Sequence, residues 1–367
     1  MRLSAVASSG GCGDTGGCGD TGGSAGCAGQ PSLRKCRTQD TTMPVPGVTM
    51  PVPGTMIPAP GDHGGDAESV ARYLGVDISH ILDLSVTLNP FAPDLRNVIR
   101  EAVDMGYISR YPDACRARCM LAAEIGVDPN LLVLTNGGAE AIALTAKLVG
   151  KGYADPPEFS LYESHLPVVD RGGVRFRSNP CNPTGLLAKA DEQAGVWDEA
   201  FFQMATGSWS RGDHLSGAYV VGSLTKLFAC PGLRIGYTIA PDERSAEELR
   251  KLQPLWSFGG IESYVVTAVI ERSDIVHWAK LLASARDDLA ALLASKGFDV
   301  RTADAPWVLV EADKGFRERL ARVGVLVRDC SNFGMDGIYR VSVCSDSGLE
   351  RLEMALHSLP AVQDGGR

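Results

Sequence analysis

One lysine, Lys226, stands where a side-chain amine could act as a nucleophile. It lies in SLTKLFACPGLRIGY, just after an apolar segment, between hydroxyl side chains and eight residues before Arg234. An amine attacks a carbonyl carbon only in its neutral form, and burial or a cation such as Arg234 lowers the lysine pKa toward that form. A lone lysine after a strand is nearly always a solvated surface residue, so this interpretation depends on the residues around it.

Three further side chains could complete a site for an aromatic aldehyde. Asp198, in WDEAF, offers a carboxylate that can keep a pyridine nitrogen protonated. Asn182, in the Pro- and Gly-rich SNPCNPTG, can donate to a ring hydroxyl, and Phe159, in DPPEFSLY, can stack on a ring. Taken singly, an acidic helix start, a turn and a core phenylalanine would explain them.

A phosphate-binding element is also expected. LTNGGAEAI (134–142) has the pattern of a strand, a Gly-Gly turn and a helix start, where backbone N–H groups and the helix dipole bind anions. Ser223, Thr225 and Arg234 can add side-chain contacts. An aldehyde, a pyridine ring and a phosphate together describe pyridoxal 5′-phosphate (PLP).

The elements that must position these residues alternate between short apolar strands and helices. Strands are expected at 131–135, 174–178, 218–223 and 234–240, with a helix over 139–150. This alternation predicts an α/β domain with a mainly parallel sheet. Three later apolar segments and a helix over 348–359 predict a smaller α+β domain at the C-terminus.

Four regions are expected along the chain. Residues 1–60 contain CGDTGG twice and TMPVPG twice, a low-complexity composition that predicts a disordered tail. Residues 61–114 are expected to lie over the site and to join the small domain. Residues 115–255 would form the cofactor-binding large domain, and 256–367 the small one. The large domain looks shortened, because only 20 residues separate Phe159 from Asn179.

In this order, the SNPCNPTG, DEAF and SLTK-to-GLRIGY segments resemble the fold-type I PLP enzymes of the class I/II aminotransferase superfamily. The branch resembled is that of histidinol-phosphate aminotransferase and threonine-phosphate decarboxylase, from about His63 to the C-terminus. The resemblance implies that Lys226 bonds the cofactor aldehyde as an imine and that Asp198 partners the pyridine nitrogen. It also implies that Asn182 hydrogen-bonds the ring hydroxyl and that Phe159 stacks on the ring face. The residues implied to bind the cofactor phosphate are Gly138, Ala139, Ser223, Thr225 and Arg234.

The same resemblance implies the substrate side of the site. Tyr111, in RYPD, would reach the phosphate in a neighbouring subunit, which implies a homodimer. Arg340 would grip an α-carboxylate and Arg328 a substrate phosphate. His63, in an HGG segment, and Asn89 would be further contacts, so the expected substrate is a small phosphorylated amino acid.

The resemblance leaves three functions open. The segment HGGDAESVARYLGVD and Phe201 in DEAF resemble threonine-phosphate decarboxylase more than histidinol-phosphate aminotransferase. This implies decarboxylation of L-threonine O-3-phosphate to (R)-1-aminopropan-2-yl phosphate in cobalamin biosynthesis. The alternative is an aminotransferase acting on histidinol phosphate or a related amino donor. A second alternative, suggested by the shortened domain, is a PLP-binding protein with little catalytic activity.

Composition argues against other classes of protein. A net charge of −9 gives no basic patch for nucleic acid or an anionic membrane surface. No apolar stretch approaches the roughly 18 residues of a membrane span, and MRLSAVASSG lacks the apolar core of a secretion signal. The expected location is the cytoplasm. Cys12, Cys18, Cys27 and Cys36 lack the paired spacing of a structural zinc site, so no metal is expected.

Overall fold

The computed structural model describes residues 57–59 and 64–359. The expected tail, apart from 57–59, the four N-terminal cysteines and His63 therefore lie outside the described residues. Among the residues that are described, no helix is both long and apolar enough to cross a membrane.

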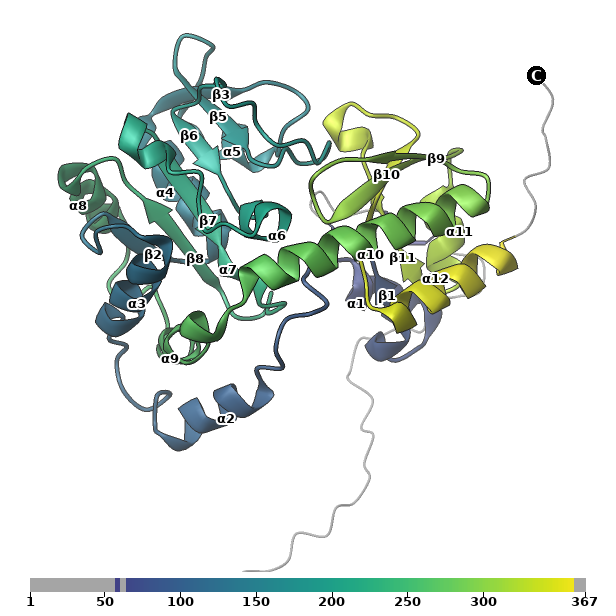
Figure 1. Cartoon of the computed structure of the whole chain (residues 1–367), viewed down its shortest axis with the longest axis horizontal. Helices are drawn as coiled ribbons and strands as arrows, with labels where there is room; N and C mark the ends of the chain where they lie inside the picture. The colour runs from purple at the N-terminus through teal and green to yellow at the C-terminus, as the bar shows by residue number, and fades with distance from the viewer. Residues whose placement is uncertain (1–56, 60–63, 360–367) are drawn as a thin grey trace, which may run out of the picture. The chain divides into compact units, whose positions relative to one another are not determined.

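The large domain is built on a seven-stranded sheet (Figure 1). Its strands in spatial order are β2 (Leu132–Asn136), β8 (Ile235–Ile239), β7 (Tyr219–Ser223), β6 (Val196–Asp198), β5 (Val174–Ser178), β3 (Lys151–Ala154) and β4 (Val168–Val169). The four expected strands are confirmed, and the sheet is mainly parallel. The exception is β8, which runs antiparallel to both neighbours. Apolar composition predicts such a strand but carries no information on its direction.

Helices cover this sheet and lead to the second domain. The helices before and within the large domain are α1 (Ala67–Leu74), α2 (Arg96–Asp104), α3 (Cys115–Ile125), α4 (Gly137–Val149), α5 (Leu161–His165), α6 (Phe202–Thr206), α7 (Leu224–Leu227), α8 (Glu243–Leu252) and α9 (Gly260–Val269). The later helices are α10 (Ile275–Ser295), α11 (Phe316–Arg322) and α12 (Asp346–Ser358).

The small domain is α+β, as expected. Its antiparallel sheet has the order β12 (Arg328–Asp329), β13 (Ile338–Ser342), β10 (Trp307–Glu311) and β9 (Asp299–Thr302). A separate parallel pair joins β1 (Leu82–Asp83) to β11 (Val325–Leu326), so the N-terminal segment is built into this domain.

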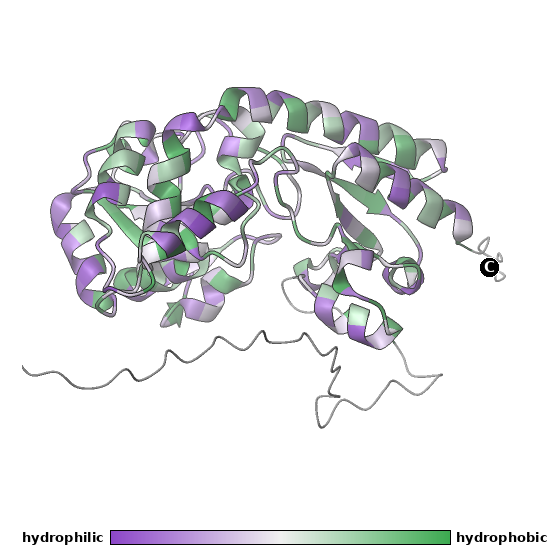
Figure 2. Cartoon of the chain, turned by 90° about the horizontal axis from the view of Figure 1, so that it is seen from below, coloured by the Kyte–Doolittle hydropathy of each residue, from purple (hydrophilic) through white to green (hydrophobic). Residues whose placement is uncertain are grey.

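Two hydrophobic cores meet along α10. Trp278 and Leu282 pack with the large sheet, and Leu289 and Leu293 pack with β10 and β13. Figure 1 shows α10 running from one domain to the other, and in Figure 2 hydrophilic and hydrophobic residues alternate along the helices. Buried residues of α9 also belong to the core of the large sheet. The domain boundary that the sequence predicts at 255–256 stays a prediction.

Two parallel connections contain no helix. Residues 170–173 alone join β4 to β5, and 179–195 join β5 to β6 without a helix. Parallel strands usually need a crossover of a dozen or more residues. Here Val169 and Val174 both lie opposite Gly152, on either side of β3, so the chain passes across the start of that strand. A Cβ on Gly173 would come 2.5 Å from the Lys151 carbonyl oxygen, so only glycine permits this close crossing.

The contact between β8 and the Gly-Gly turn gives a test of the fold. A Cβ on Gly236 would overlap the Gly137 backbone and come 2.6 Å from the Gly138 nitrogen. We expect Gly236→Ala to lower the free energy of unfolding by about 1–3 kcal/mol, the usual cost of overpacking. Denaturant unfolding measures this change. Gly232→Ala, four residues away in open space, is the control and should change it little.

Candidate active site

A cavity of about 180 Å³ lies at the carboxyl ends of β5, β6 and β7. Ser178, Asp198 and Ser223 are the last residues of these strands, and ligands of open α/β sheets bind at this edge. Ten of the predicted site residues line this one cavity: Gly138, Ala139, Phe159, Asn182, Asp198, Ser223, Thr225, Lys226, Arg234 and Arg340. Sequence segments up to about 200 residues apart therefore meet at a single place.

Lys226 lies on α7, the short helix that follows β7, and its amine faces the cavity. Its side chain is half-buried, yet desolvation lowers its pKa to about 8, with further lowering by the charges of Arg340 and Arg234. Asp198 and Asp83 oppose this shift. At pH 7 roughly a tenth of the amine is then neutral, against far below one per cent for an ordinary lysine.

Asp198 is a buried carboxylate held by two donors. The Tyr162 hydroxyl donates to Oδ2 at 2.8 Å, and the Ala200 N–H donates to Oδ1 at 2.9 Å. Burial raises the Asp198 pKa, whereas these hydrogen bonds and the Lys226 charge oppose the rise. A carboxylate fixed in this way can accept a hydrogen bond from a protonated pyridine nitrogen. Tyr162 was not among the predicted residues.

The start of α4 forms a cradle for an anion. Gly137 has a φ of 79°, and a Cβ there would overlap the Arg234 guanidinium, so glycine brings the backbone against that cation. The Ser223 and Thr225 hydroxyls lie 2.8 Å apart beside it. The N-terminus of this 13-residue helix, two hydroxyls and a guanidinium together provide the hydrogen-bond donors that a phosphate dianion requires.

Arg340, on β13, closes the other side of the cavity. Its Nη1 donates to Asn182 Oδ1 at 2.5 Å and its Nη2 to the Ser85 carbonyl at 3.0 Å. Burial and the nearby Arg328 charge lower the Arg340 pKa to about 10. Its buried Nε has no hydrogen-bond partner among the described residues, and no described carboxylate lies within ion-pair distance of it. A guanidinium in this state fits a carboxylate ligand.

Three predicted residues lie away from the cavity lining. Asn89 donates from Nδ2 to the Leu227 carbonyl at 3.0 Å, and its N–H to the Lys226 carbonyl, so it fixes α7 rather than facing the cavity. Arg328 is buried on β12, opposite Arg340. Tyr111 is 76% exposed and stacks on Trp256 with ring centroids 4.4 Å apart.

Several residues of the site went unnoticed in the sequence. Trp307 donates from Nε1 to the Pro183 carbonyl at 2.8 Å and packs edge-on against Phe201, which lines the cavity. Val86, Thr87 and Ser178 also line it. Val86 and Thr87 stand in SVTLNP, the segment from which Asn89 was selected, so proximity to that motif was the available signal. Trp307 stands in no motif.

The chain resembles one family of known proteins along much of its length. The family model described as Aminotransferase class I and II matches residues 173–358. Threonine-phosphate decarboxylase of Salmonella typhimurium is 26% identical over 353 residues, covering 81% of this chain and 96% of that protein. Histidinol-phosphate aminotransferase 2 of Carboxydothermus hydrogenoformans is 26% identical over 332 residues, covering 76% and 91%. The match to the Salmonella protein spans 353 positions but contains only about 297 residues of this chain (81% of 367), so that relative contains segments that this chain lacks.

Solved structures show the same fold. L-threonine-O-3-phosphate decarboxylase from Porphyromonas gingivalis matches with a TM-score of 0.64 at 22% identity, covering 76% of this chain and 98% of that one. Histidinol-phosphate aminotransferase from Sinorhizobium meliloti, in complex with pyridoxal-5′-phosphate, matches with a TM-score of 0.66 at 16% identity, covering 80% and 95%. The expected PLP-dependent fold type I is confirmed.

The environment of Lys226 predicts an early titration. Because its pKa lies near 8, competitive acetylation with acetic anhydride should label Lys226 with a midpoint near pH 8. Lys251, on α8, is the internal control, since Glu248 and Glu247 raise its pKa above the ordinary 10.5. Mass spectrometry of the two peptides across pH 6–11 measures both. Equal midpoints for the two lysines would contradict the desolvated site.

Removal of the Lys226 amine gives a second test. Lys226→Ala should abolish the visible absorbance that PLP shows when it is attached to a protein lysine, since no other described lysine lines the cavity. Absorbance spectra of the purified protein with added PLP measure this. Lys251→Ala should leave the band unchanged. A band that survives in Lys226→Ala would refute the assignment of this lysine.

Proposed function

The chain belongs to the aminotransferase class I and II family, and we propose that within it the protein decarboxylates L-threonine O-3-phosphate to (R)-1-aminopropan-2-yl phosphate. Members of the family depend on PLP, so the protein is a PLP-dependent enzyme. We assign the reaction to cobalamin biosynthesis. We further propose a homodimer, in which the exposed Tyr111 reaches the partner's site, working in the cytoplasm.

Each cofactor-facing residue has one role in this proposal. PLP, when bound, supplies an electron sink for the bond that breaks at the α-carbon. Asp198 holds the proton on the pyridine nitrogen, and Asn182 donates to the ring hydroxyl. Phe159 covers the ring face. The phosphate is held by the Ser223 and Thr225 hydroxyls, the Arg234 guanidinium and the Gly138 and Ala139 N–H groups.

The observation that carries the proposal is the pair of buried arginines, Arg340 and Arg328. They are cross-strand partners on β13 and β12: Arg340 lines the cavity, and Arg328 is its neighbour outside the lining. Two buried cations favour a substrate with two anionic groups. Threonine phosphate carries a carboxylate and a phosphate, whereas histidinol phosphate carries a phosphate alone.

Arg340 and Lys226 would divide the chemistry between them. Arg340 would bind the α-carboxylate and orient the bond that is to be cleaved, while PLP would supply the electron sink for it. The Lys226 Nζ, with a pKa near 8, then returns a proton to the α-carbon. Phe201, at the cavity wall, has no hydroxyl that could donate to the oxygen of the cofactor ring. Asn182 is therefore the proposed side-chain donor to that oxygen.

Amino transfer is the second candidate, and one observation favours it. A pair of arginines also fits a dicarboxylic amino acid or its oxo acid, such as 2-oxoglutarate. The two reactions differ in which bond of the α-carbon is broken, and the same residues can serve either. The remaining alternative, PLP binding with little catalysis, draws on the two connections that have no helix. Ten of the predicted cofactor and carboxylate contacts, all except Tyr111, nevertheless line one cavity, which favours an active enzyme.

Product analysis tests the assignment. The purified protein with PLP should release CO₂ from carboxyl-labelled threonine phosphate and should not pass its amino group to 2-oxoglutarate. Transfer from histidinol phosphate to 2-oxoglutarate without CO₂ release would establish the aminotransferase instead. Binding of PLP without either product would leave the third alternative.

The arginine pair gives a quantitative version of the same test. Arg328→Ala should raise the KM for threonine phosphate about 10- to 100-fold, the usual effect of losing a charged hydrogen bond. Arg340→Ala should lower kcat as well, because the carboxylate loses its orientation. Arg301→Ala is the matched control: this exposed arginine on β9 pairs with Glu311 in the same sheet. It should leave both constants within about twofold.

A further inference from the structure

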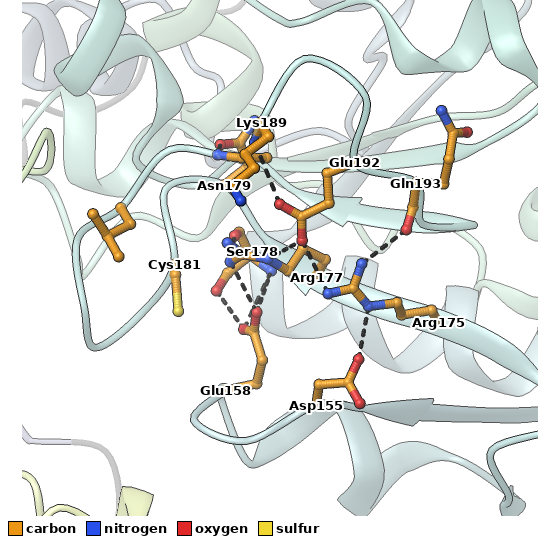
Figure 3. Close-up of polar contacts among 12 residues, drawn as sticks. Asp155, Glu158, Arg175, Arg177, Ser178, Asn179, Cys181, Lys189, Glu192 and Gln193 are labelled. Carbon is orange, nitrogen blue, oxygen red and sulfur yellow. Dashed lines mark hydrogen bonds and ion pairs between the residues drawn. The ribbon is translucent and has the colours of Figure 1, made fainter.

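An ion-pair network lies beside the cavity where the β5–β6 connection has no helix (Figure 3). Arg175 and Arg177 alternate on β5 with the buried Phe176, so they share the other face of the strand. Arg177 pairs with Glu158 at 3.0 Å and with Glu192 at 2.9 Å. Arg175 pairs with Glu192 and, at the outer end, with Asp155, both at 2.9 Å. The network thereby ties the 179–195 connection to β5 and to the loop after β3.

Glu158 connects this network to Ser178, a residue that lines the cavity. Its side chain is 4% exposed, and it accepts hydrogen bonds from the N–H and the hydroxyl of Ser178 and from Arg177. The Ser178 hydroxyl also accepts from the Asn182 N–H at 2.9 Å. With its one proton directed to Glu158, this hydroxyl presents a lone pair to Asn182. A single serine thus connects the carboxylate to the backbone of Asn182.

Asn182 carries the connection into the cavity. Its Oδ1 accepts from Arg340 Nη1, and the residue lines the cavity with Ser178. A continuous series of contacts therefore runs from Glu158 through Ser178 and Asn182 to Arg340. Glu158 itself does not line the cavity.

We propose that Glu158 is a positioning residue for the cofactor site: through the Ser178 hydroxyl it fixes Asn182, and through Asn182 the orientation of Arg340. This inference rests on the cofactor site of the proposed function and holds for either decarboxylation or amino transfer. In this protein a buried carboxylate, rather than a crossover helix, secures the start of the loop that faces the cofactor.

The ionisation of Glu158 should make the proposed positioning role depend on pH. Burial raises its pKa to about 7, against the lowering effects of Ser178 and Arg177. The titratable or charged groups that face it are Arg177 from β5, Cys181 from the following loop and Tyr162 from α5. Burial raises the pKa of Cys181 and of Tyr162, so both stay neutral near pH 7. Below pH 7 Glu158 gains a proton, and the Ser178 hydroxyl loses its charged acceptor.

A double-mutant cycle tests the proposal with cofactor binding, in the absence of substrate. We expect Glu158→Ala and Ser178→Ala each to weaken PLP binding to the full-length protein about tenfold, as for the loss of a buried hydrogen bond. Because both changes break the same series of contacts, the double variant should bind within about twofold of either single variant. Equilibrium titration of cofactor-free protein, followed by absorbance, gives the dissociation constants.

Glu158→Gln separates charge from hydrogen bonding. The amide oxygen can still accept from Ser178, so this variant should fold and bind PLP more tightly than Glu158→Ala. The ratio of its dissociation constant to the wild-type value should rise between pH 6 and pH 8, as wild-type Glu158 ionises. Taking this ratio cancels the titrations of Lys226 and of the cofactor, which both proteins share. Asp155→Asn, at the outer end of the same network, is the control and should bind within twofold of wild type at each pH.

The outcomes are distinct. Wild-type affinity in Glu158→Ala, or a double-variant loss equal to the product of the single losses, would overturn the positioning role. So would a pH-independent ratio for Glu158→Gln. If the wild-type protein itself failed to bind PLP, the proposed function would fall, whereas failure of the cycle alone leaves that function intact.

Discussion

The cavity around Lys226 is lined by more cations than carboxylates, and this excess of positive charge constrains the rest of the site. Arg340 and Arg234 both lower the pKa of this lysine, and Asp198 and Asp83 oppose them. Three cations, Lys226, Arg234 and Arg340, line the cavity beside the single carboxylate of Asp198, and such an excess is costly unless the cavity binds anions. PLP brings a phosphate, and the proposed substrate brings a phosphate and a carboxylate. The same cations that keep the lysine reactive therefore also select its ligands.

The arrangement of strands in the large sheet brings these charged residues together. Each of β5, β6 and β7 ends in a polar residue. Because the three strands are parallel, these residues lie at the same edge of the sheet. The antiparallel β8 supplies Arg234 just before its start and places Gly236 against the Gly-Gly turn. Backbone contact of this kind leaves no room for a side chain, so the anion cradle depends on glycine both on β8, at Gly236, and at the start of α4, at Gly137. Small-domain residues Trp307 and Arg340 then hold the Asn182 loop from the other side.

Much of the cofactor side could be predicted from the sequence, because each residue stands in a short contiguous motif. Lys226, Asp198 and Asn182 are examples, and the strands before them were apolar enough to recognise. Contacts between distant segments could not be predicted in this way. Tyr162 reaches Asp198 from 36 positions away, and Glu158 reaches Ser178 across 20. The motif of Asn89 was recognised, but its hydrogen bond to the Leu227 carbonyl was not, and its contact with a substrate stays a prediction. The direction of β8 was hidden because apolar patterning reports burial and not polarity.

The 21 residues of α10 have a mechanical consequence. One end of this uninterrupted helix is anchored in the large-sheet core and the other in the small-sheet core, so it acts as a strut of fixed length between them. Rotation of one core relative to the other must bend the turns between Leu282 and Leu289, at the cost of helical hydrogen bonds. Lys226 and the arginines of the small sheet thus belong to two cores that a single helix connects.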